Sequence, residues 1–155
     1  MKKVKLREYT TPLLIDYADE VTLVKNKKVE STNFYNAIFG REIASLRYRL
    51  FLLKNQNQPI AVIKSLIPVD QSSNQLVLRD IDENMELSVD HQYSAHNISQ
   101  MVMLTWASQE EKKLLGKANT DLQVLIRSLK IKNEYNSIIR IEEDSMLPEY
   151  FTLEK

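Results

Sequence analysis

Arg49 and Arg127 are the side chains of this sequence best suited to bind a small anion. Each lies on what we predict to be the first strand of a β-hairpin, at matching places in the two halves of the chain. A guanidinium group binds a carboxylate or a phosphate through two parallel hydrogen bonds. We therefore predict that both arginines contact an anionic ligand. The alternative is that each is a surface residue on the solvent side of an amphipathic strand.

Glu143 is a third candidate for a ligand site. It follows Ile139 and Ile141 at alternating positions, so the three side chains share one face of a strand. On an interior face, its carboxylate would be buried and would need a polar partner. We predict that Glu143 accepts hydrogen bonds from ligand hydroxyls; the alternative is a strand-end charge in the acidic run 142–144. Tyr93 can line the mouth of such a pocket, although nothing separates it from the other tyrosines.

The composition excludes several kinds of site. The chain has no cysteine, which rules out disulfides, thiolate zinc sites and cysteine nucleophiles. It has only two glycines, which rules out glycine-rich phosphate loops and dinucleotide fingerprints. His91 and His96 lie five residues apart on a polar stretch, which is not a convincing metal pair. We expect neither a metal nor a cofactor.

The length of 155 residues fits one domain, whose core is large enough for folding without disulfides or a bound metal. The chain has 21 lysine and arginine residues and 21 aspartate and glutamate residues, so its formal net charge is zero. A free-standing nucleic-acid binder usually has an excess of basic residues. The longest apolar runs have about ten residues, whereas a membrane helix needs about 20. A signal peptide has an apolar stretch after its basic start, and no such stretch follows the basic residues at the start of this sequence. We expect a cytoplasmic protein with no membrane contact.

The two glycines mark a repeated pattern. Residues 32–39 and residues 108–115 read as short helices that end at Gly40 and Gly116, because glycine takes the left-handed position after a helix without strain. Ser108 and Glu111 form a capping box at the start of the second helix. A strand precedes each helix, and a hairpin follows it. The sequence therefore predicts a strand–helix–hairpin unit that occurs twice.

The strands are predicted from their β-branched content and from the polar turns between them. They cover residues 21–29, 43–53, 60–67, 101–106, 122–131 and 137–143. Polar turns at 55–58 and 132–136 close the two hairpins, and each hairpin is followed by a Leu/Ile-Pro pair. Met101, Met103 and Leu104 are expected to pack in the core or against a second copy of the chain, and Trp106 in the core.

These elements predict an α+β fold. Hairpins pair antiparallel, so the two halves supply about six strands to one sheet, and the short amphipathic helices cover one of its faces. We predict a single ligand-binding domain over residues 1–155, with a first half at about 12–68 and a second half at about 89–153. The acidic link between them can hold a short helix around residues 76–85.

The second half resembles the UTRA domain, the effector-binding half of one subfamily of GntR-type (HutC/FarR-like) transcription regulators. The resemblance rests on motifs at Ala107–Gly116, Leu125–Arg127, Ile141–Glu143 and Tyr150-Phe151. The first half matches at Gln58–Ala61 and Lys64–Pro68. These motifs occur in the family's order and spacing over roughly residues 20–153. The resemblance implies the fold shared by UTRA domains and chorismate lyase.

Chorismate lyase is the close alternative. Arg49 stands ten residues before Pro59, as an arginine does in the lyase, and Glu143 precedes Leu147-Pro148 much as the lyase's catalytic glutamate precedes a Leu-Pro pair. In that reading Arg49 holds the product carboxylate and Glu143 is the positioned acid of a chorismate–pyruvate lyase. The helix at 107–116 favours UTRA instead, and we expect a protein that is not an enzyme.

The UTRA resemblance implies a ligand sensor. A small anionic metabolite such as a sugar phosphate would bind between the halves and shift a two-state arrangement of a homodimer. DNA would be bound only through a winged-helix domain, for which this sequence has no room. We therefore expect an excised sensor half or a stand-alone sensor. Phe51, Leu53 and Ile63 stand where many UTRA domains have polar pocket residues, so a third reading is a family member without a pocket.

Overall fold

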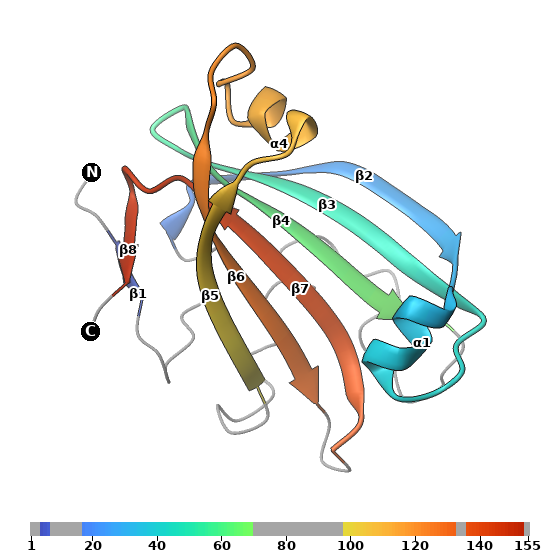
Figure 1. Cartoon of the computed structure of the whole chain (residues 1–155). Helices are drawn as coiled ribbons and strands as arrows, with labels where there is room; N and C mark the ends of the chain where they lie inside the picture. The colour runs from blue at the N-terminus through green and yellow to red at the C-terminus, as the bar shows by residue number, and fades with distance from the viewer. Residues whose placement is uncertain (1–3, 7–16, 70–97, 133–135, 154–155) are drawn as a thin grey trace.

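A computed structural model describes residues 4–6, 17–69, 98–132 and 136–153 of the chain. Its main feature is a six-stranded antiparallel sheet with two short helices (Figure 1). The predicted α+β fold is therefore confirmed. Within these residues, no helix has the length and apolar character that crossing a bilayer requires.

The described elements follow the predicted order along the chain. The helices are α1 (Asn33–Phe39) and α4 (Gln109–Leu114). The strands are β1 (Val4–Leu6), β2 (Glu20–Glu30), β3 (Ser45–Asn55), β4 (Gln58–Pro68), β5 (Ile98–Trp106), β6 (Gln123–Lys132), β7 (Ile138–Met146) and β8 (Phe151–Leu153).

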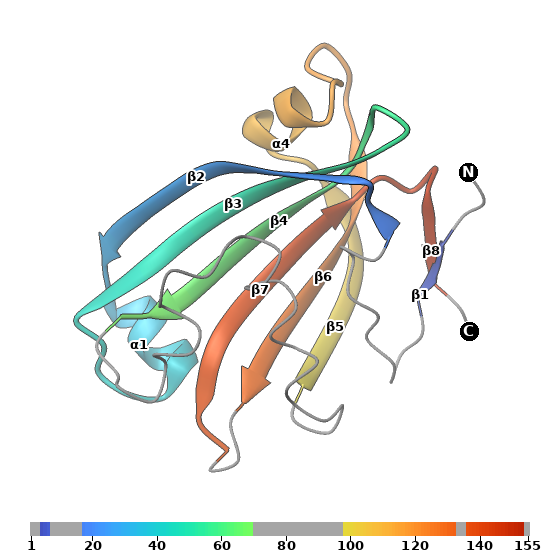
Figure 2. The same cartoon turned by 180° about the vertical axis from the view of Figure 1, so that it is seen from behind.

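The strand order of the large sheet is β2-β3-β4-β7-β6-β5. Each half contributes three neighbouring strands, and the two hairpins meet where β4 pairs with β7. In both halves a strand precedes a helix and a hairpin follows it, so the predicted internal repeat is present. This arrangement leaves β2 and β5 as the two edge strands and places residues of the hairpins at the centre of the sheet (Figure 2).

Both helices are capped as their sequences predict. The Thr32 side chain accepts a hydrogen bond from the Tyr35 backbone N–H, and α1 ends at Gly40 with a φ of 74°. In α4, the Ser108 hydroxyl accepts from the Glu111 N–H, and the Glu111 carboxylate accepts from the Ser108 N–H. A substituted Cβ would be strained at the left-handed φ of Gly40, which explains glycine there.

The structure also differs from the prediction. β7 continues to Met146, because its charged residues Glu142 and Asp144 are buried within the sheet instead of ending it. A short parallel pair, β1 with β8, was not predicted, since three residues are too few to show a hydrophobic period. The predicted helix around residues 76–85 lies outside the described residues.

The two faces of the sheet carry different side chains. Because residues paired across antiparallel strands point the same way and neighbours along a strand alternate, the register assigns each residue to a face. On the helix face, Phe39 of α1 packs with Leu46, and Leu115 at the end of α4 packs with Leu50. We call the opposite side the far face. There, Phe51 packs with Ile63 and Phe151, among others.

Strand β5 is an edge strand with exposed apolar side chains. Trp106 is 64% exposed, and Met101, Met103 and Leu104 are also exposed. The prediction that Trp106 lies in the core is therefore wrong for this chain. The residue ends a strand that has a neighbour on only one side, so its ring is not enclosed.

Candidate functional site

The structure places Arg49 and Arg127 on the far face of the sheet. Arg49 is opposite Ser65 on β4, and Arg127 is opposite Asp144 on β7. Both arginines are buried, with exposed fractions of 9% and 1%. They are thus not surface residues of amphipathic strands. They lie on the same face, with β4 and β7 between them.

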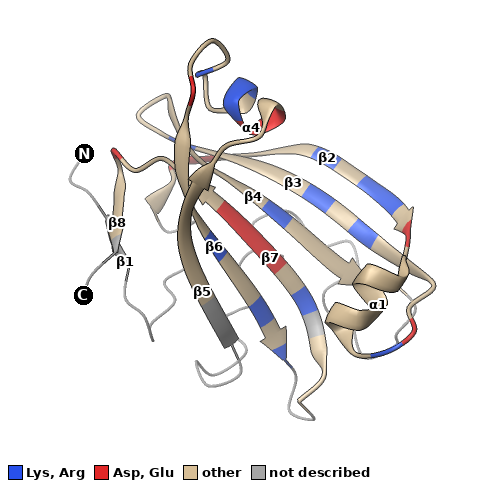
Figure 3. Ribbon diagram, in the orientation of Figure 1, with Lys and Arg blue, Asp and Glu red and all other residues tan. Residues whose placement is uncertain are grey.

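Four further polar residues join these two arginines at the centre of the far face. We call the whole group the arginine cluster, and all of its members are buried. The members are Arg49, Ser65, Arg127, Arg140, Glu142 and Asp144. They come from β3, β4, β6 and β7, and therefore from both halves of the chain. Figure 3 shows the charged positions along the strands of the sheet.

Two ion pairs organise the arginine cluster. The Nε and Nη2 atoms of Arg127 each lie 2.9 Å from Oδ2 of Asp144. The Nη2 atom of Arg140 lies 2.7 Å from Oε1 of Glu142. These are short, charge-assisted hydrogen bonds, which a buried charge needs. Arg49, Arg127 and Arg140 all make further interactions as well.

The acidic members of the arginine cluster affect one another. Complete burial and the neighbouring Glu142 carboxylate raise the pKa of Asp144 well above its usual range, although the Arg127 guanidinium opposes this. The cluster contains three arginines but only two acidic residues, Glu142 and Asp144. The described side chains of the cluster therefore carry an excess of positive charge.

Glu143 lies on the other side of the sheet. It faces the helices in register with Lys64 and Ser128, and its side chain is 43% exposed. The expectation that Glu143 would be the buried carboxylate does not hold, because Glu142 and Asp144 are buried in its place. The structure therefore separates Glu143 from Arg49 and Arg127. Tyr93 lies outside the described residues.

The sequence contained a signal for the residues that were missed. Arg140, Glu142 and Asp144 alternate along β7, and a period of two places charged side chains on one face of a strand. The same face contains Arg127, through its register with Asp144. Pairing this charge pattern with the arginines of the neighbouring strands would have indicated the arginine cluster.

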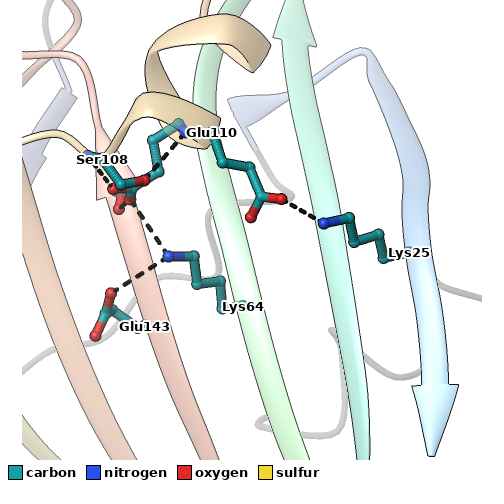
Figure 4. A network of polar contacts seen from close by, with 7 residues as sticks. Lys25, Lys64, Ser108, Glu110 and Glu143 are labelled. Carbon is teal, nitrogen blue, oxygen red and sulfur yellow. Dashed lines mark hydrogen bonds and ion pairs between the residues drawn. The ribbon is translucent and has the colours of Figure 1, made fainter.

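A second polar network lies on the helix face, beside α4. The Ser145 hydroxyl donates to the buried Glu111 carboxylate, whose other oxygen accepts from the Ser108 N–H at 2.8 Å. Lys64 Nζ lies 3.9 Å from Glu111 Oε2 and 4.0 Å from Glu143 Oε1 (Figure 4). Glu111 thus ties the start of α4 to β7 in the centre of the sheet.

The Glu111 carboxyl group has a lowered pKa for identifiable reasons. Burial alone would raise that pKa, but the hydrogen bonds from Ser145 and Ser108 and the Lys64 ammonium together outweigh burial. The side chain of the preceding residue, Glu110, is 42% exposed and pairs with Lys25. The Lys25 hydrogen bond holds the pKa of Glu110 below its usual value, against a small opposing effect of burial.

Comparison with known proteins identifies the fold. No protein-family model and no curated protein matches the sequence. Several solved structures have a similar fold. The effector domain of PhnF from Mycobacterium smegmatis has a TM-score of 0.68 at 13% identity, covering 86% of this chain and 83% of that one. A GntR-family transcriptional regulator from Enterococcus faecalis has a TM-score of 0.67 at 11% identity, covering 88% and 100%.

A third match spans nearly the whole of both chains. The gene product SA0254 from Staphylococcus aureus has a TM-score of 0.71 at 7% identity and covers 98% of this chain and 99% of that one. The first two structures are a regulator's effector domain and a GntR-family regulator, not enzymes, so they give the lyase reading no support. At these identities the likeness concerns the fold. The chain has the UTRA-like fold of the effector-binding domains of GntR-family regulators.

Proposed function

We propose that this chain is the effector-binding domain of a GntR-family transcription regulator and that its effector is a small anionic metabolite such as a sugar phosphate. The observation that carries the proposal is the arginine cluster on the far face of a sheet with the effector-domain fold. DNA binding is assigned to a winged-helix domain outside these 155 residues, which agrees with the balanced charge of the chain.

The chemistry of the cluster fits an anion. A buried ion pair is commonly no more stabilising than well-packed apolar residues. A contribution to folding stability therefore does not explain why six polar residues are buried on one face of the sheet. Guanidinium groups match the geometry of carboxylate and phosphate. Each also carries five N–H donors, so an arginine that already makes an ion pair can bind a second anion. An anion here would touch both halves of the chain.

Thermal unfolding of the purified chain with a panel of metabolites tests this proposal. The panel contains sugar phosphates, amino-sugar phosphates, amino acids, chorismate and 4-hydroxybenzoate. A ligand at 100 times its Kd adds about 2.7 kcal/mol to stability, which raises the Tm of a chain this size by roughly 5–10 °C. We expect such a shift with a phosphorylated sugar. A shift confined to chorismate and 4-hydroxybenzoate would contradict the sensor assignment.

Substitution of Arg49 shows whether the ligand binds at the arginine cluster. Arg49→Lys keeps the charge but removes the paired hydrogen bonds, so we expect it to lose most of the ligand-induced shift. Arg47→Lys is the matched control, because Arg47 lies two residues earlier on the same strand and contacts Asn26 on β2. Equal ligand-induced shifts in both variants would place the ligand elsewhere.

We also propose that the chain forms a homodimer through β5. The nine residues of β5 include no charged side chain, whereas the other edge strand, β2, has five: Glu20, Lys25, Lys27, Lys28 and Glu30. Charges on an edge strand prevent pairing with another sheet, and an uncharged, apolar edge favours it. Pairing of β5 with its copy across a two-fold axis would satisfy the edge backbone groups and cover the exposed apolar side chains.

A charge placed on β5 tests the homodimer. We expect the wild-type chain to be dimeric at micromolar concentration and Leu104→Lys to be monomeric, because the exposed Leu104 would lie beside side chains of the partner strand. Sedimentation velocity measures both. Val24→Lys, an equivalent change on β2, is the control and should remain dimeric. A monomeric wild type, or a dimeric Leu104→Lys variant, would contradict this interface.

A further inference from the structure

A pocket of about 560 Å³ opens on the helix face, beside α1. Its volume is typical of sites for small molecules. Its floor consists of two rows of side chains that run across β3, β4, β7, β6 and β5, and its wall is α1. The residues that line it are Phe34, Tyr35, Ile38, Tyr48, Lys64, Leu66, Met101, Ser128, Lys130, Ile141 and Glu143. We call it the helix-face pocket.

The floor of the pocket contains both polar and apolar side chains. The row nearer α4 contains Lys64, Glu143 and Ser128, which are paired across the sheet, and ends at Met101. The next row contains Leu66 and Ile141, which pack with the Phe39–Leu46 cluster beneath α1, and Lys130, which is paired with Ile141. A ligand that fits this arrangement has both an apolar body and a polar group.

The charges on this face favour an anionic polar group. Lys64 Nζ is 3.9 Å from Glu111 and 4.0 Å from Glu143, both at the outer limit of an ion pair, so neither carboxylate holds the ammonium closely. Lys130 forms no ion pair with any residue that the structure describes. Lys25 already pairs with Glu110.

Two further residues of the face support this reading. The ammonium of Lys27 lies 5.7 Å from the centre of the Tyr48 ring and adds positive charge. Burial, together with the Glu110 carboxylate, raises the pKa of Tyr48 to about 12, so the phenol keeps its proton and can donate a hydrogen bond. Ammonium and phenol donors beside an apolar surface match the head and body of an apolar carboxylate.

We propose that the helix-face pocket is a second ligand site, which binds an apolar carboxylate with an aryl or medium-length acyl body. The body packs under α1 on Ile38, Leu66 and Ile141, and the carboxylate lies between the Lys64 and Lys130 ammonium groups. This site is separate from the arginine cluster, because the two lie on opposite faces of the sheet. The inference therefore does not depend on the effector proposed above.

Calorimetric titration of the full chain with octanoate tests the proposal, with octylammonium and octanol as probes that keep the body and change the head. We expect octanoate to bind saturably and at least tenfold more tightly than either of the other two. Equal affinity for octanoate and octylammonium, or no saturable octanoate binding, would overturn the proposal.

Variants separate this pocket from the other sites. Lys130→Gln should weaken octanoate about tenfold or more, as expected for the loss of a charge-assisted contact. Lys132→Gln, two residues along the same strand and not part of the pocket, should bind like the wild type. Arg49→Lys should also leave octanoate binding unchanged. Equal binding by the Lys130 and Lys132 variants would overturn the site.

A second copy of the chain is the competing occupant, because Met101 belongs both to the pocket and to the edge strand β5. Binding of octanoate to the wild-type dimer with the affinity seen in the Leu104→Lys variant supports a ligand site. Binding by the Leu104→Lys variant alone would show that the partner copy fills the pocket, and would overturn the proposal.

Discussion

Arg127→Met is expected to lower the free energy of unfolding by about 3–5 kcal/mol, the usual loss when one partner of a buried ion pair is removed. Arg127 is 1% exposed and bonds Asp144 through two of its nitrogen atoms. The methionine has a similar length but no charge, so Asp144 would remain buried beside Glu142. Urea unfolding of the wild type and the variant at one pH measures the difference.

A double variant and a change of pH test the cause of this loss. Arg127→Met with Asp144→Leu should recover most of the stability, because both charges are then replaced by apolar groups. The loss in Arg127→Met should also be smaller at pH 5 than at pH 8. The raised pKa of Asp144 favours its protonation at the lower pH, and a protonated carboxyl group leaves no unpaired charge when Arg127 is removed. A pH-independent loss with no recovery in the double variant would contradict the ion-pair explanation.

Glu111→Ala is expected to cost about 2–4 kcal/mol, the sum of a lost helix cap and a lost charge-assisted hydrogen bond. The buried Glu111 caps α4 through the Ser108 N–H and accepts a hydrogen bond from Ser145 on β7. The alanine would leave the Ser145 hydroxyl buried without this acceptor. Glu110→Ala is the matched control, because its ion pair with Lys25 is exposed and should change stability by less than about 0.5 kcal/mol.

The pH dependence of Glu111 has a definite sign. Its pKa is lowered in the folded chain, so its contribution is complete above the usual glutamate pKa and is lost as the pH falls through the folded value. The wild type should therefore lose stability in acid more steeply than Glu111→Gln, which does not titrate. Thermal unfolding between pH 7 and pH 3 compares them. Parallel pH profiles would show that Glu111 is not ionised in the native chain.

Much of the fold was predictable because local chemistry determines it. Gly40 defines the end of α1 through its backbone conformation, and the Ser108–Glu111 capping box defines the start of α4 through local side chain–backbone hydrogen bonds. The hairpin between β3 and β4 turns at Gln56 and Asn57, which both have positive φ values, and asparagine adopts this conformation more readily than most residues. The pairing of β3 with β4 and of β6 with β7 followed from the short turns between them, whereas the pairing of β4 with β7 was not predicted.

The side of the sheet that each candidate residue faces was harder to predict. Glu143 shares a face with Ile141, as alternation requires, but that face is the one partly covered by short helices and open at a pocket. Which face buries charge depends on pairing between strands that are distant in sequence, such as Arg127 with Asp144. One strand alone contains no such information. The exposure of Trp106 likewise follows from the place of β5 at the edge of the sheet.

The two proposed sites lie on opposite faces of the sheet and differ in kind. The arginine cluster joins β3, β4, β6 and β7 on the far face, whereas the helix-face pocket lies beside α1 and reaches β5. A ligand that bridges the two hairpins at β4 and β7 can change how the halves sit against each other, and β5 belongs to one of those halves. Under the proposed function, an effector bound at the cluster would therefore bias the proposed dimer through β5.

An NMR titration that follows the arginine Nε–H signals of the labelled chain shows whether the effector binds at the arginine cluster. The titrant is the sugar phosphate that gives the largest thermal shift. We predict saturable changes in the Arg49 and Arg127 signals at the same Kd, with the Arg47 signal unchanged. Saturable binding that leaves the Arg49 and Arg127 signals in place would contradict the assignment of the arginine cluster as the effector site.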